Sequence, residues 1–164
     1  MECQKVISNS SPLINLSKVH QLDLIQQLYG QITVPQAVYD ELFLKDMTKT
    51  GSHAINKLVD KNIISIREVS DRNLVKALHK DLDFGESEVI ALALELKADL
   101  IIIDETDARK IAELYDLKKT GFIGLLIKAK EQGLITDIKP LLDSAVNKGF
   151  WINPKLYQKI IKSI

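Results

Sequence analysis

The chain has 164 residues, of which 46% are hydrophobic and 27% charged, and its 22 basic residues balance its 22 acidic ones. These values indicate one globular domain over residues 1–164 and exclude a protein held to nucleic acid by its overall charge. The single cysteine, Cys3, cannot form an internal disulfide, and no apolar run reaches the ~18 residues of a membrane span. Because no signal peptide is evident either, we expect a cytoplasmic protein without membrane contact.

Short apolar runs alternate with amphipathic segments along the chain. We expect strands at residues 6–8, 31–34, 63–66, 100–103 and 118–120. Helical patterns lie between and after them, at residues 12–16, 22–28, 35–44, 54–60, 74–78, 85–93, 108–115, 121–131, 138–146 and within 151–164. Ser11 is expected to cap the first helix, and residues 45–52 are expected to form a mobile loop. This alternation predicts a three-layer α/β/α sandwich around a mainly parallel sheet.

The expected strand at residues 100–103 has no polar alternation and runs straight into a cluster of acids. A strand of this kind is buried on both faces, as in parallel sheets, whose ligand sites lie beyond the carboxyl ends of the strands. Asp104 occupies that position, with Glu105 and Asp107 behind it. Asp104 therefore becomes the first candidate for a functional side chain, although an aspartate here also suits an N-cap.

Two further acids lie on apolar faces of expected helices. Glu41 shares a face with Val38 and Leu42, and Glu86 begins the buried stripe of the helix at 85–93. An ordinary interpretation exists for each, because a glutamate can extend its head into solvent or complement a helix dipole. Glu88 lies about 200° around the helix from Glu86 and is expected on a solvated face.

Taken together, these acids converge on one edge of the predicted sheet. Clustered carboxylates raise one another's pKa unless a cation lies among them. Oxygen ligands of this kind suit Mg²⁺ or Mn²⁺, which can activate water and stabilise the leaving oxygen in phosphodiester cleavage.

Four segments, in this order and spacing, resemble a PIN-domain protein, and more narrowly the prokaryotic PIN subfamily DUF3368. They are the sequences VISNSSPLI at 6–14, VPQAVYDEL at 34–42, GESEVIALA at 85–93 and Ile103-Asp104. The segments GFIGLL at 121–126 and AKEQGLI at 129–135 resemble the distal half of that subfamily, so the resemblance covers nearly the whole chain.

The resemblance implies a metal-dependent ribonuclease, often the toxin of a VapC-like type II toxin–antitoxin pair. On the family pattern Glu41, Glu86 and Asp104 would be catalytic, and they would hold Mg²⁺ or Mn²⁺ together with Asp107 and Asn9. Residues that would contact substrate are Ser10, Ser11 and Arg109. RNA would be the substrate, and a small antitoxin protein and a homodimer are further expected partners, the latter through Leu22, Ile25 and Leu28 unless these pack in the core.

The family's first acid is replaced here by Asn9. An amide oxygen can still ligate a hard cation but brings no negative charge, so we expect weaker metal binding than in a site with a carboxylate at this position.

A second hypothesis is therefore a catalytically weak or inactive RNA-binding or interaction protein on the same fold, with phosphate contacts from Lys118, Lys119, Lys128 or Lys130. A receiver-like phosphotransfer domain fits the order of the acids poorly. The histidines are spread along the chain without metal-ligand spacing.

Overall fold

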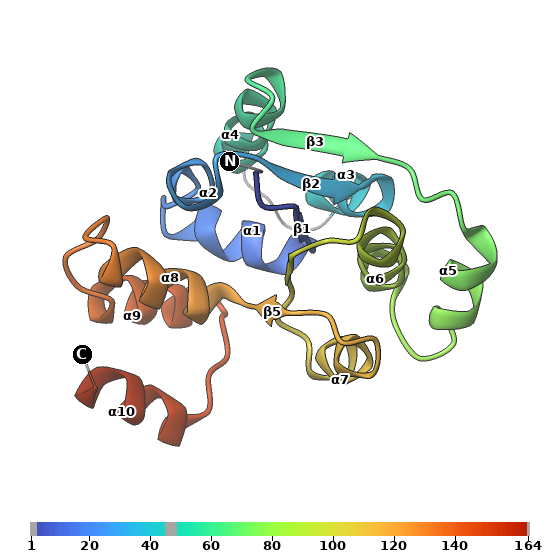
Figure 1. The fold of residues 1–164 in the computed structure, drawn as a ribbon. Helices are drawn as coiled ribbons and strands as arrows, with labels where there is room; N and C mark the ends of the chain where they lie inside the picture. The colour runs from blue at the N-terminus through green and yellow to red at the C-terminus, as the bar shows by residue number, and fades with distance from the viewer. Residues whose placement is uncertain (1–2, 45–48, 164) are drawn as a thin grey trace.

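The computed structural model describes residues 3–44 and 49–163 of the chain (Figure 1). Within them, the strands form one parallel sheet in the order β3-β2-β1-β4-β5. The α/β/α fold class expected from the sequence is confirmed. The strands are β1 (Val6–Ser8), β2 (Ile32–Pro35), β3 (Ile64–Arg67), β4 (Leu100–Ile102) and β5 (Lys119–Thr120).

The central strands β1 and β4 lie side by side and end together. Their register pairs Val6 with Leu100 and Ser8 with Ile102. Ile101 and Ile102 are completely buried, because helices cover both faces of the sheet. The Asn9 amide donates to the Ile102 carbonyl at 2.9 Å, so the chain leaves both strands at the same edge.

The helices pack on the sheet and on one another. In Figure 1, α1, α2, α8 and α9 lie on the left of the central strands, and α5, α6 and α7 lie on the right. The helices are α1 (Ser10–Lys18), α2 (Asp23–Tyr29), α3 (Gln36–Leu44), α4 (Lys49–Asp60), α5 (Arg72–Leu78), α6 (Phe84–Leu96), α7 (Thr106–Leu114), α8 (Phe122–Glu131), α9 (Lys139–Asn147) and α10 (Pro154–Lys162). No helix in the described ranges is long and apolar enough to cross a membrane.

The start of α1 differs from the sequence prediction. The N-cap position is Asn9, and Ser11, expected to be the cap, lies inside the first turn. Its hydroxyl donates instead to the Glu105 carboxylate at 2.8 Å. The Ser11 hydroxyl is therefore bound to Glu105 and does not cap the helix. A local sequence pattern cannot include this acid, because Glu105 lies far away in the sequence.

The prediction of a mobile loop at residues 45–52 is wrong for its second half. Helix α4 begins at Lys49, and Gly51 is buried within it. The polar composition of this segment favours a loop, but the burial of Ile55 and Leu58 one and two turns later anchors a helix that extends upstream. Residues 45–48 lie outside the described residues.

The apolar face considered for a homodimer is mostly core. Ile25 is fully buried, Leu22 is 7% exposed, and Leu28 packs against the same hydrophobic cluster. These side chains therefore mainly stabilise the fold of the monomer.

The carboxyl-terminal tail packs on the body, as its helical pattern predicts. Ile160 of α10 is buried in the core cluster. The Tyr157 hydroxyl donates to Asp143 of α9 at 2.5 Å, and the Asn153 side chain accepts from the Lys155 amide to cap α10.

Glu88 is buried, which contradicts its expected place on a solvated face. Its carboxylate accepts from the Ala37 amide at 3.0 Å and from the Arg72 guanidinium at 2.7 Å. The Ala37 amide lies in the first turn of α3, where backbone donors lack intrahelical partners. Glu88 therefore joins α6 to the start of α3, an interhelical role that the period of α6 alone does not reveal.

Glu88→Gln should lower the free energy of unfolding by about 1–3 kcal/mol, because charge-assisted bonds to two elements are weakened. Urea denaturation measures the change. The exposed Glu68 supplies the control, since Glu68→Gln removes an acid without a described partner in the core. Equal stability of the Glu88→Gln variant and the native chain would contradict this role.

Candidate functional site

A cleft of about 550 Å³ lies at the carboxyl edge of the sheet. It is bounded by the segment before α6, the end of β4 and the start of α7, and the segment before α10. Its lining residues are Asp81, Leu82, Asp83, Glu86, Asp104, Glu105, Thr106, Asp107 and Trp151. Six of these nine carry carboxylates, so the cleft is strongly acidic.

Asp104 follows β4 and is held at one carboxylate oxygen only. Its Oδ1 accepts from the Phe122 amide at 2.9 Å, whereas its Oδ2 is buried without a hydrogen-bond partner. Burial raises the pKa of Asp104 from 3.8 to about 6, against the lowering effects of the Phe122 amide and of Arg109. A buried carboxylate oxygen without a donor is costly and is expected where an ion binds.

The residue beside this carboxylate must be glycine. A Cβ atom added at Gly121 would collide with Oδ1 of Asp104 and come within 3.2 Å of the Arg109 guanidinium. The missing side chain therefore lets Asp104 reach the first backbone amide of α8.

Asn9 and Ser11 both donate to Glu105. The Asn9 side-chain amide donates to Oε2 at 3.3 Å, and the Ser11 hydroxyl donates to Oε1 at 2.8 Å. This pairing orients the Asn9 side chain, and its Oδ1 is left buried without a partner. In the described part of the chain, Asn9 Oδ1 and Asp104 Oδ2 are the buried side-chain polar atoms that lack a hydrogen-bond partner. Asn9 follows β1 and Asp104 follows the neighbouring strand β4.

Glu41 approaches the same edge from α3. The Ser10 hydroxyl donates to its Oε2 at 2.8 Å. A Cβ atom at Gly85 would collide with the Glu41 carboxylate, so glycine at this position lets the carboxylate lie against the first turn of α6. Two positions expected to contact substrate, Ser10 and Ser11, thus hold acids of the site.

Glu86 is buried in the first turn of α6. Burial, together with the Asp83 carboxylate and the charges of Glu105 and Glu41, raises its pKa from 4.5 to about 8. Asp83 caps the helix by accepting from the Glu86 amide at 2.8 Å. Glu86 therefore carries a proton near neutral pH as long as no cation is present.

Asp107 and Arg109 lie on α7 in different settings. Asp107 is exposed at the rim of the cleft. The Arg109 guanidinium donates to the Ile103 carbonyl at 2.9 Å and so braces the segment that carries Asp104. The Nη1 atom of Arg109, expected to contact substrate, is therefore already bound to the backbone of the fold.

Three site residues were not singled out from the sequence. Glu105 was noted among the acids but not assigned to the site, Asp83 precedes the α6 pattern, and the Asn15 side chain lowers the pKa of Asp104. Ser11, Asn15 and Lys18 stand at i, i+4 and i+7 and form a polar stripe along α1. This stripe is the sequence signal that points to Asn15.

The donor set matches a hard divalent cation in its chemistry. The orphaned oxygens are an amide and a carboxylate oxygen, the ligand types that Mg²⁺ and Mn²⁺ prefer. Among residues 3–44 and 49–163, however, no group of three or more His, Cys, Asp or Glu side chains is close enough to hold a metal ion. Glu41 and Glu105 are instead hydrogen-bonded to the serines of α1.

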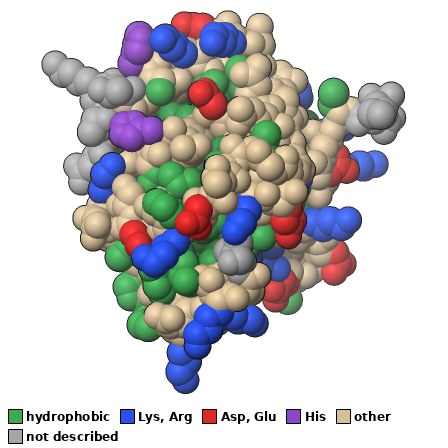
Figure 2. All heavy atoms as spheres, turned by 90° about the vertical axis from the view of Figure 1, so that its left-hand side faces the viewer, with side chains coloured by type: hydrophobic (Ala, Val, Ile, Leu, Met, Phe, Trp, Pro, Cys, Tyr) green, Lys and Arg blue, Asp and Glu red, His purple; other side chains and the backbone are tan. Residues whose placement is uncertain are grey.

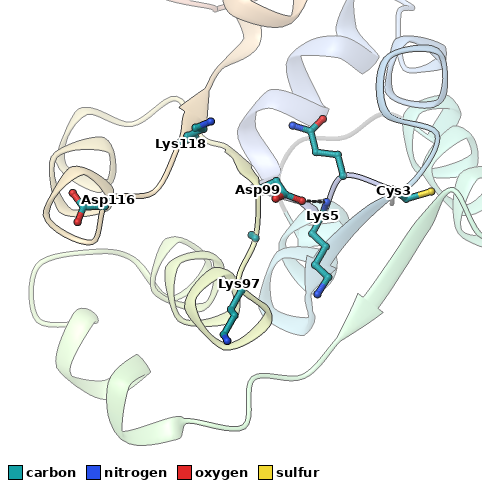
Figure 3. A pocket seen from close by; sticks show the side chains of 8 residues that line it. Cys3, Lys5, Lys97, Asp99, Asp116 and Lys118 are labelled. Atoms are coloured by element: carbon teal, nitrogen blue, oxygen red, sulfur yellow. Dashed lines mark hydrogen bonds between the residues drawn. The ribbon is translucent and has the colours of Figure 1, made fainter. Parts of the chain in front are cut away.

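A second hollow, of about 920 Å³, opens at the opposite edge of the sheet (Figure 3). There the Lys5 amide donates to Asp99 at 2.6 Å. The side chains of Lys5, Lys97 and Lys118 are exposed, and no orphaned buried atom of the described residues lies among them. The carboxyl edge is therefore the better candidate for chemistry.

A parallel α/β sheet with acids gathered beyond its central strands is the arrangement of PIN domains, and the chain belongs to the PIN-domain family. More narrowly, the DUF3368 family model, described as a PIN domain, matches residues 5–164. The family has a nuclease-like fold, generally uses divalent metal ions and suggests RNA as a substrate. A search of curated proteins found no match.

Glu86→Gln should flatten the pH dependence of stability in the metal-free protein. Because the pKa of Glu86 is raised from 4.5 to about 8, the folded chain keeps a proton that the unfolded chain releases between these values. The free energy of unfolding therefore falls as the pH rises across this window. Asp104, whose pKa is raised from 3.8 to about 6, adds a smaller decline in the free energy of unfolding between these two pH values.

Urea denaturation in a chelator, from about pH 5 to pH 9, measures this slope. The glutamine variant should gain most over the native chain near the upper end, and Glu68→Gln should run parallel to the native curve. A Glu86→Gln curve parallel to the native one would show that Glu86 ionises normally.

Proposed function

We propose that this protein hydrolyses phosphodiester bonds in RNA with a bound Mg²⁺ or Mn²⁺ ion. The observation that carries the proposal is the pair of buried, partnerless oxygens, Asn9 Oδ1 and Asp104 Oδ2, on neighbouring strand ends. Membership of a family with a nuclease-like fold supports it.

When bound, a divalent cation supplies a water nucleophile at neutral pH and offsets the charge that develops on the leaving oxygen. Asn9, Glu41, Glu86 and Asp104 would hold it, with Asp107 at the rim. Glu105 orients the Asn9 amide through its hydrogen bond. Ser10 restrains the Glu41 carboxylate in the same manner.

The raised pKa values make cation binding a proton-releasing event. Glu86, with its pKa at about 8, and Asp104, at about 6, must both be ionised to act as ligands. Affinity for the cation should therefore increase with pH up to about 8, where Glu86 loses its proton in the metal-free protein.

A second candidate is an RNA-binding protein with weak or no catalysis. It is favoured by Asn9, which brings no charge, and by the absence of a closed three-residue acid group among the described side chains. Cation affinity separates the two candidates, since a pure binder needs none.

We also propose that the protein is the toxin of a type II toxin–antitoxin pair, with a small antitoxin lying over the acidic cleft. The family resemblance supports this role. Induced expression should arrest bacterial growth, and the Asp104→Asn variant should not. Arrest by both proteins would argue against a catalytic toxin.

Asp104→Asn should abolish Mn²⁺-dependent cleavage of single-stranded RNA, with a loss of at least about 100-fold in rate, because a ligand charge is removed at the best-placed carboxylate. The same variant should lose Mn²⁺ binding measured by calorimetry. Asp99→Asn, at the opposite edge of the sheet, provides the control. Undiminished cleavage by Asp104→Asn would overturn the assignment.

Asn9→Asp should tighten Mn²⁺ binding and destabilise the metal-free protein. The new carboxylate would face Glu105 across the present 3.3 Å contact, and this like-charge contact is relieved only by a cation. Calorimetry gives the affinity, and thermal denaturation with and without Mn²⁺ gives the stability. If neither the native chain nor this variant binds Mn²⁺ at millimolar concentration, the non-catalytic candidate replaces the nuclease.

A further inference from the structure

Trp151 lies at the acidic cleft with most of its side chain in solvent. It lines the cleft together with Glu86 and Asp104, yet it is 77% exposed. An indole ring left in water at a polar cleft forgoes the stabilisation that burial would bring. A ligand that covers this ring would recover it.

The backbone around Trp151 is held on both sides. The Phe150 ring meets the Phe122 ring edge-on, with 5.0 Å between centroids, and the Phe150 amide donates to the Ala145 carbonyl at 2.9 Å. On the other side, Asn153 caps α10. Since the Phe122 amide also binds Asp104, Trp151 and the catalytic candidate are anchored on the same residue.

The helix that follows Trp151 carries a stripe of positive charge. Lys155, Lys159 and Lys162 are exposed and stand at i, i+4 and i+7, which places them on one face of α10. In Figure 2, Lys and Arg side chains gather at the lower end of the face shown, at the height of α10 in Figure 1. A ligand that extends from the cleft along this face of α10 would meet positive charge, which favours an anionic ligand.

We propose that Trp151 stacks on an unpaired base of single-stranded RNA whose adjoining phosphates lie along the lysine stripe of α10. The inference rests on the proposed function in taking RNA as the ligand. It assigns to the segment after α9 the task of positioning the strand beside Asp104. Stacking on an aromatic ring favours a single strand over a duplex, whose bases are already stacked.

Trp151 is the protein's single tryptophan, so its fluorescence reports directly on this contact. The probe is a short phosphorothioate oligoadenylate, which resists hydrolysis, added in Mg²⁺. We expect quenching by this single strand and none by an abasic strand of equal length or by a matched duplex. Binding of the single strand without any fluorescence change would overturn the proposal.

Affinity measured by anisotropy of a labelled probe completes the test. Trp151→Ala should weaken binding by about 5- to 150-fold, and Trp151→Phe should recover most of the loss. Leu114→Ala is the control, because Leu114 is 81% exposed but does not line the cleft. Unchanged affinity in Trp151→Ala, or tighter binding of a basic peptide than of RNA at this ring, would overturn the proposal.

The lysine stripe is tested by salt dependence. The double variant Lys155→Gln, Lys159→Gln should reduce the slope of log affinity against log salt by about 1.4, at about 0.7 for each phosphate contact with a single strand. Lys57→Gln, Lys61→Gln removes a matched pair of exposed lysines elsewhere and should leave the slope unchanged. Equal slopes in both double variants would remove the stripe from the proposal.

These measurements are independent of cleavage. Quenching together with an Asp104→Asn variant that still cleaves would leave the stacking role intact and refute the proposed catalytic site. Cleavage that depends on Asp104, together with RNA binding that does not depend on Trp151, would support the proposed catalytic site and refute the stacking role.

Discussion

The hydrogen bond from the Phe122 amide to Asp104 is the constraint on which the carboxyl edge depends. It joins the end of β4 to the start of α8, and it requires glycine at position 121 because the carboxylate lies where a side chain would be. Arg109 closes the same corner from α7 by binding the Ile103 carbonyl. The result is a carboxylate fixed at one oxygen, with the other buried and without a donor.

Crowding of negative charge accounts for the rest of the site. Glu86 keeps its proton near neutral pH because burial and neighbouring acids oppose its ionisation. At position 9 the same crowding is avoided by an amide, which donates to Glu105 where a carboxylate would repel it. Asn9 and Glu105 together thus present one charge and one amide oxygen, a combination that remains stable without a cation.

Much of the fold follows from local patterns. The apolar run before Asp104 predicts a central buried strand, and the period of the helix at 85–93 correctly places Glu86 on its buried face. The predictions that are wrong concern residues whose partners are distant in sequence. Glu88 is buried because its carboxylate binds the Arg72 guanidinium and the Ala37 amide at the start of α3.

The site residues divide along the same line. Asp104 stands where strand order alone predicts a functional acid. The involvement of Glu105 depends on how the turn after β4 directs its side chain toward α1, and this direction is set by tertiary contacts with Asn9 and Ser11. Trp151 belongs to no periodic pattern, and its position at the cleft follows from the packing of Phe150 on Phe122.

The two ends of the strands differ in charge. Six carboxylates line the cleft, whereas three lysines and two aspartates line the hollow at the opposite edge. The zero net charge of the chain therefore conceals a strongly negative patch at the carboxyl edge. A polyanion that approaches this patch is repelled by the carboxylates unless nearby lysines or a bound cation offset their charge.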